Sequence, residues 1–194
     1  MPPHILLIGI GNEYRSDDDA GLAAIRALKA KGLPGTHFKE CTGDGADLIE
    51  TWRKEQMVIL IDAVSSGAPP GTVYRFDALT QPMPARYSFH STHAFGVVEA
   101  IELARALHAL PPCLIVYAIE GKNFATGMGL SPEVEKAVQQ VVEQVAGEVR
   151  DALTLIRQCF FCIGQGIDFV GKLSKLLSKV VIGLSVSRAR QKRS

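Results

Sequence analysis

The sequence predicts an α/β protein: a three-layer α/β/α sandwich around a mostly parallel, flavodoxin-like twisted sheet with one antiparallel edge strand. Short, continuous apolar runs at residues 4–11, 57–64 and 113–121 are typical of strands that are buried on both faces. Longer amphipathic stretches separate these runs, and alternating strands and helices favour parallel strands joined by right-handed crossovers. The chain, 194 residues long, can bury a full hydrophobic core.

The remaining elements follow from local signals. Helices are expected over residues 19–31, 46–54, 93–110 and 131–156. Gly32 is expected to end the first of these, and Ser131 to cap the last, with Pro132 at its first position. Further expected elements are a second strand at 36–41, a turn at 65–71, the edge strand at 72–78 and an irregular, proline-containing stretch at 79–92.

Charge divides the chain into two parts. Residues 1–156 carry a net charge of −6 and residues 157–194 a net charge of +7, so we expect an α/β domain followed by a basic, partly disordered extension. Lys172, Lys175 and Lys179 share one helical face, which is typical of an amphipathic helix on a membrane surface or in a partner's groove. A helix packed on the body, or an extension without function, explains the same pattern.

The cysteines and the termini narrow the class of protein further. Four scattered cysteines are too few for a disulfide scaffold, and the chain start lacks a basic signal-peptide region, so we expect a reduced, cytoplasmic protein. Cys159 and Cys162 form a lone C-x-x-C, which without a second pair indicates two small hydrophobic residues rather than a metal site. The basic C-terminal end is too short to predict a nucleic-acid partner.

Three ionisable residues stand where a doubly wound sheet places its ligands. Asp18 follows the first strand, Asp62 ends the third, and His93 precedes a long helix. If they converge, two carboxylates and an imidazole suit a divalent ion such as Ni²⁺ or Zn²⁺. Each also has a plain structural explanation as a strand end or a turn residue.

The stretch GIGNEYRSDDDAG at residues 9–21 has its own alternatives. Asp17 or Ser16 could cap the following helix. Dinucleotide binding is disfavoured, because the third glycine of that motif is missing and three aspartates would repel a pyrophosphate.

Four segments in order, GIGNEYRSDDDAG, ILIDAVSSGAPPGTV, HSTHAFG and IEG…GLSPEV, resemble the [NiFe]-hydrogenase maturation endopeptidases over residues 4–156. The resemblance implies an enzyme that removes a C-terminal peptide from the nickel-loaded precursor of a hydrogenase large subunit. It implies that Asp18, Asp62 and His93 bind metal. It implies that the enzyme has no permanent cofactor of its own. The ligands instead recognise the nickel of the substrate, for which zinc or cadmium can substitute.

The resemblance also sets expectations for neighbouring residues. Asp17 and Asp19 would shape the helix start and add negative potential, although the family often has glycine at the position of Asp19. Gly9 and Gly11 would allow a tight turn. Cys41 stands near a position where the family commonly has an acidic residue, and Asp44 is a candidate substitute.

The leading hypothesis is therefore a maturation peptidase in which Asp18 and Asp62 are catalytic. The metal could polarise the scissile carbonyl or activate a water, or Asp62 could act as general base. A nucleophile elbow and an H-E-x-x-H motif are both missing, which disfavours a serine mechanism and a standard zinc protease. The alternatives are a nickel-binding chaperone or checkpoint protein without catalysis, and a small-molecule hydrolase.

Overall fold

A computed structural model describes residues 5–83, 88–89 and 95–163, with the side chains of residues 5–83 and 95–155. The elements, in chain order, are β1 (Ile5–Ile10), η1 (Ser16–Asp19), α1 (Ala20–Ala30), β2 (Thr36–Cys41), α2 (Gly45–Trp52), β3 (Met57–Ser65), β4 (Val73–Asp77), β5 (Ser88–Phe89), α3 (Val97–Ala106), β6 (Leu114–Glu120) and α4 (Pro132–Ile163).

The strands form one sheet in the order β2-β1-β3-β6-β4. Strands β2, β1, β3 and β6 are parallel, and β4 pairs antiparallel with β6 at the edge. The predicted fold class, including the antiparallel edge strand, is confirmed. The short strand β5, which pairs antiparallel with the end of β3, falls in the stretch that was expected to be irregular. With only two residues it has no periodicity that the sequence could reveal.

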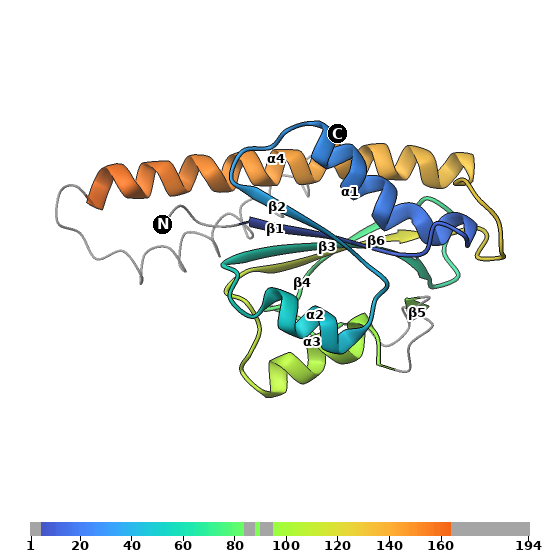
Figure 1. Ribbon diagram of the computed structural model, residues 1–194, viewed down its shortest axis with the longest axis horizontal. Coiled ribbons are helices and arrows are strands. Elements are labelled where there is room, and N and C mark those ends of the chain that lie inside the picture. Colours follow the sequence, from blue (N-terminus) through green and yellow to red (C-terminus); the bar gives the residue numbers. More distant parts are fainter. Residues whose placement is uncertain (1–4, 84–87, 90–94, 164–194) are drawn as a thin grey trace, which may run out of the picture. The chain divides into compact units, whose positions relative to one another are not determined.

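Helices cover both faces of the sheet (Figure 1). Helices α2 and α3 lie on one face, and α1 with the first half of α4 lies on the other. Alternate residues of β1, among them Leu6 and Ile8, join Trp52 of α2 and Ile101 of α3 in one buried cluster. The residues between them point to the α1 face. A first compact unit ends at Ala146, within α4.

The third predicted helix is shorter than residues 93–110. Within the described residues α3 begins after Gly96, whose backbone N–H donates to the Glu99 carboxylate at 3.1 Å. At the other end His108 is left-handed, with φ 52°, and the Ala109 N–H donates to the Ala104 carbonyl at 2.8 Å. This arrangement is a Schellman motif that ends the helix without glycine, which explains why composition did not predict it.

The last helix begins at Pro132 as predicted but continues to Ile163, past the expected end at residue 156. Cys159 and Cys162 fall on its final turns, beyond the described side chains. The three tail lysines lie outside the described residues, so the predicted basic extension and its membrane contact stay predictions. None of the described helices combines the length and the apolarity that a membrane span requires.

Candidate active site

The start of α1 packs directly on the carboxyl ends of β1 and β3. A Cβ atom at Gly21 would overlap the carbonyl oxygens of Ile10 and Ile61, and one at Gly9 would overlap the Gly21 carbonyl. Gly9 therefore permits close packing of helix on strand, not the tight turn that was expected of it. The turn itself needs Gly11, which has φ +153° and whose Cβ would overlap the Asp18 carbonyl.

This packing brings Asp18 and Asp62 into one electrostatic environment. Asp62 was expected to end its strand, but it lies within β3, because β3 continues beside β6 as far as Ser65. It follows Ile61, the last β3 residue that pairs with β1, while Asp18 lies in η1 at the entrance to α1. Both side chains are buried, with residue exposures of 4% for Asp18 and 3% for Asp62.

Burial raises the pKa of both carboxyl groups. For Asp62 the pKa lies well above its ordinary value, first because the group is desolvated and also because Asp18 repels its charge. The Ala63 N–H, 2.7 Å from Asp62 Oδ1, opposes this shift. For Asp18, burial raises the pKa and the Arg15 guanidinium, 4.0 Å away, partly offsets the effect. A buried carboxylate that is repelled by a second one favours the protonated form or a cation nearby.

Asp17, the first aspartate of the triplet, has a different role from the one predicted. Its fully buried carboxylate accepts hydrogen bonds from the backbone N–H groups of Lys122 and Asn123 at 2.8 and 2.9 Å. It also accepts from the Ser131 N–H at 2.7 Å and the Ser131 hydroxyl at 3.0 Å. Neither Asp17 nor Ser16 caps a helix with its side chain, so that expectation was wrong. Asp17 instead ties the β6–α4 loop to the β1–α1 loop.

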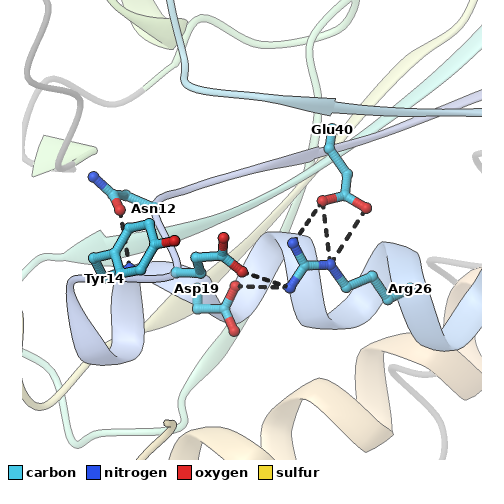
Figure 2. Close-up of polar contacts among 6 residues, drawn as sticks. Asn12, Tyr14, Asp19, Arg26 and Glu40 are labelled. Carbon is cyan, nitrogen blue, oxygen red and sulfur yellow. Dashed lines mark hydrogen bonds and ion pairs between the residues drawn. The ribbon is translucent and has the colours of Figure 1, made fainter. Parts of the chain in front are cut away.

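Asp19 belongs to a surface network centred on Arg26 of α1 (Figure 2). The Arg26 guanidinium contacts Glu40 at 2.8 Å, Glu13 at 3.4 Å and Asp19 at 3.8 Å. Burial raises the pKa of Asp19, and Arg26 partly offsets the shift. The network joins the end of β2 to the β1–α1 loop, so Asp19 adds less free negative potential than expected.

The segment after β2 is also occupied by structural contacts. Asp44 Oδ1 accepts from the N–H groups of Ala46 and Asp47, each at 3.0 Å, and so caps α2. Cys41 is buried with its sulfur 3.7 Å from the Asp47 carboxylate, and burial raises the thiol pKa to about 11. The contacts described for the Asp44 side chain are thus those of a helix cap. A site role for Asp44 stays a prediction.

Glu120 is a further buried carboxylate at the carboxyl end of the sheet, which the sequence analysis did not identify. It ends β6, is 2% exposed and accepts from the backbone N–H of Ser66 at 2.8 Å and of Gly67 at 2.9 Å. The Ser66 hydroxyl donates to it at 2.6 Å. Asp62 was identified because it is a carboxylate expected at the end of a buried strand, and Glu120 ends an apolar run in the same way.

His93 lies outside the described residues. Two positions later, Phe95 is fixed to the β2–α2 loop: its carbonyl accepts from the Gly45 N–H at 2.9 Å, and its ring fills the space where a Gly45 Cβ would stand. The described residues alone contain no group of three metal-ligating side chains. Of the three predicted site residues, the structure describes Asp18 and Asp62, and the charge of Asp18 raises the pKa of Asp62. The role of the three residues as ligands stays a prediction.

Known proteins resemble this chain in sequence and fold. The family model "Hydrogenase maturation protease" matches residues 42–148. A hydrogenase expression/formation protein, HupD of Thiocapsa roseopersicina, is 28% identical over 144 residues, which cover 73% of this chain and 65% of HupD.

Two solved structures share the fold. The hydrogenase maturating endopeptidase HybD from E. coli superposes with a TM-score of 0.63 at 22% identity, covering 77% of this chain and 93% of that one. The [NiFe] hydrogenase maturation protease HybD from Thermococcus kodakarensis gives a TM-score of 0.55 at 28% identity, covering 73% and 96%. Because the family model spans more than half of the residues, the chain belongs to the hydrogenase maturation protease family.

Proposed function

We propose that this protein is an endopeptidase that removes the C-terminal peptide from the nickel-loaded precursor of a [NiFe]-hydrogenase large subunit. The observation that carries the proposal is the pair of buried carboxylates at the carboxyl edge of the sheet, Asp18 and Asp62, of which Asp18 repels the charge of Asp62. Sites in doubly wound sheets lie at this edge.

Metal recognition follows from the electrostatics of the pair. Two ionised carboxylates buried side by side destabilise the fold unless a cation compensates them. A divalent ion supplied by the substrate would relieve the repulsion, and His93 would complete a mixed oxygen and nitrogen ligand set that suits nickel. Binding energy then becomes available only from a precursor that already carries its metal, which gives the enzyme a check on nickel insertion.

The proposed chemistry is hydrolysis by water. Asp62 acts as the general base and takes a proton as the water oxygen attacks the scissile carbonyl carbon. The proton then passes to the amine as the C–N bond breaks, so Asp62 is restored. The nickel held by Asp18, Asp62 and His93 positions the peptide and can polarise its carbonyl.

The test is peptide release from purified large-subunit precursor, prepared with and without nickel and followed by mass spectrometry. We expect the wild-type protein to release the peptide only from the nickel-loaded form. Asp62→Asn and His93→Ala should each lower the rate by at least about a hundredfold. The matched control is Asp151→Asn, an exposed aspartate on α4, which should process at the wild-type rate.

Two outcomes would contradict the proposal. Normal processing of the precursor by His93→Ala would show that His93 is not needed to dock the nickel of the substrate. Tight binding of nickel-loaded precursor without peptide release would favour a chaperone instead, which would bind nickel through the same three residues.

A further inference from the structure

Two large apolar side chains stand exposed at the rim of the candidate active site. Tyr14, in the β1–η1 loop, is 61% exposed, and Met128, in the β6–α4 loop, is 77% exposed. The base of the first loop is closed by a hydrogen bond from the Asn12 N–H to the Asp18 carbonyl at 3.3 Å. Tyr14 therefore lies at the tip of a loop whose base is a candidate catalytic residue.

The two loops lie side by side. The Gly127 N–H donates to the Tyr14 carbonyl and the Ser16 N–H donates to the Gly127 carbonyl, each at 2.9 Å. A Cβ at Gly127 would come within 3.0 Å of the Ser16 hydroxyl, so glycine permits this approach. These bonds bring Tyr14 and Met128, one residue beyond Gly127, onto one stretch of surface.

The loop that presents Met128 is held at both ends by one carboxylate. Asp17 accepts from Lys122 and Asn123 where the loop begins and from Ser131 where it ends. Gly129, directly after Met128, is left-handed with φ +89°. The loop that exposes Met128 is therefore fixed at both ends, which lowers the entropy cost of ordering it when a partner binds.

The position of this surface decides what can contact it. Asp18 and Asp62 are recessed, so any protein that delivers a metal and a peptide to them must rest on the surrounding loops. Figure 2 shows that the loop of Tyr14 also carries Asp19, whose ion pair with Arg26 begins a charged network that extends to Glu40. An apolar centre beside a polar, charged rim is the usual composition of a protein–protein contact. Tyrosine is enriched among the residues that dominate binding, and methionine adapts to varied apolar surfaces.

We propose that Tyr14 and Met128 form a docking surface for an apolar segment of the hydrogenase large-subunit precursor, next to the bond to be cleaved. This inference rests on the proposed function, because that function supplies the partner. It adds that recognition involves an apolar protein contact outside the metal site.

The experiment compares Tyr14→Ala, Met128→Ala and Leu107→Ala. Leu107, at the end of α3, is 63% exposed and is the matched control, because α3 lies on the other face of the sheet from α1. The dissociation constant of each variant for nickel-loaded precursor is measured by biolayer interferometry, and KM and kcat by peptide release. All three side chains are exposed, so the melting temperature should stay at the wild-type value.

We expect Tyr14→Ala and Met128→Ala to raise the dissociation constant and KM about tenfold each. We expect kcat to stay unchanged, and Leu107→Ala to match the wild type in every measurement. Equal binding by all four proteins would overturn the docking surface, and so would a loss of kcat without a change in binding. Failure of the wild type to release peptide would contradict the proposed function, whereas the binding comparison would still test the surface.

Discussion

Four buried carboxylates lie at one edge of the sheet, and they divide into two pairs. Asp17 and Glu120 each accept at least three hydrogen bonds from neighbouring loops. Asp18 and Asp62 receive far less from the described residues: an ion pair at 4.0 Å for Asp18 and one N–H for Asp62. The residue type and burial are the same, but the partners differ.

The contrast separates residues that build the site from residues that are left for a ligand. A buried carboxylate with several N–H donors stabilises the fold and fixes loops. A buried pair with so few donors destabilises the fold, and perturbed carboxylates of this kind cluster at functional sites. We therefore assign Asp17 and Glu120 to loop anchoring, and Asp18 and Asp62 to ligand binding.

The largest stability change is expected from Asp17→Asn. An asparagine would turn an N–H donor toward groups that are themselves donors, leaving part-buried N–H groups of Lys122, Asn123 or Ser131 unpaired. We expect the free energy of unfolding in urea to fall by at least about 3 kcal/mol. The exposed Asp151→Asn should change it by less than about 0.5 kcal/mol. A stable Asp17→Asn protein would contradict the anchoring role.

A smaller loss is expected from Glu120→Gln. Glutamine keeps one acceptor oxygen, so only part of the hydrogen bonding to Ser66 and Gly67 is lost. The free energy of unfolding should fall by about 1–3 kcal/mol. Hydrogen exchange at the amides of residues 66 and 67 should become faster while exchange in α1 stays slow. Unchanged protection at these amides would mean that Glu120 does not hold the loop.

Asp62→Asn should have the opposite effect from Asp17→Asn and Glu120→Gln: it should raise the free energy of unfolding of the metal-free protein. The pKa of Asp62 is raised in the folded protein above its ordinary value of 3.8, so the folded state binds the proton more tightly than the unfolded state. The free energy of unfolding of the wild type should therefore decrease as the pH rises above about 4, and Asp62→Asn should remove the part of this decrease that comes from Asp62. At pH 7 without metal, the variant should melt at least about 2 °C higher.

Urea titrations of both proteins between pH 4 and 8 check this sign. If Asp62→Asn is less stable than the wild type at pH 7, then Asp62 stabilises the fold as Asp17 and Glu120 do. That result would contradict the assignment of Asp62 to ligand binding.

The smallest effect is expected from Arg26→Gln. Arg26 is 45% exposed, and its ion pairs with Glu13 and Glu40 are at the surface, where solvent screens them. The free energy of unfolding should change by less than about 1 kcal/mol, and the difference should shrink further in 1 M NaCl. A loss as large as that of Asp17→Asn would show that the surface network, not Asp17, holds the β1–α1 loop.

Strong periodic signals made the fold predictable. The apolar runs that became β1, β3 and β6 are long enough to be recognised without neighbours, and their alternation with helices sets the parallel order. The end of α3 was not predictable, because His108 adopts a left-handed conformation that its residue type rarely signals. The long-range contacts that define β5 leave no local pattern.

The site was predictable only in part for a related reason. Sequence position identifies which carboxylates follow strands, but it does not reveal which of them find donors from loops about a hundred residues away. Asp17 and Asp18 are adjacent, yet only Asp17 meets the N–H groups of the β6–α4 loop. Tertiary structure, rather than local sequence, separates the anchoring residue from the candidate ligand.

The proposed function requires above all that Asp18 and Asp62 together hold a divalent cation. Crystals of the protein soaked in Ni²⁺ test this directly through anomalous scattering at the nickel edge. We predict one strong peak within bonding distance of a carboxylate oxygen of Asp18 and of Asp62, and its loss in Asp62→Asn. Nickel bound elsewhere, or a peak that persists in Asp62→Asn, would contradict the account.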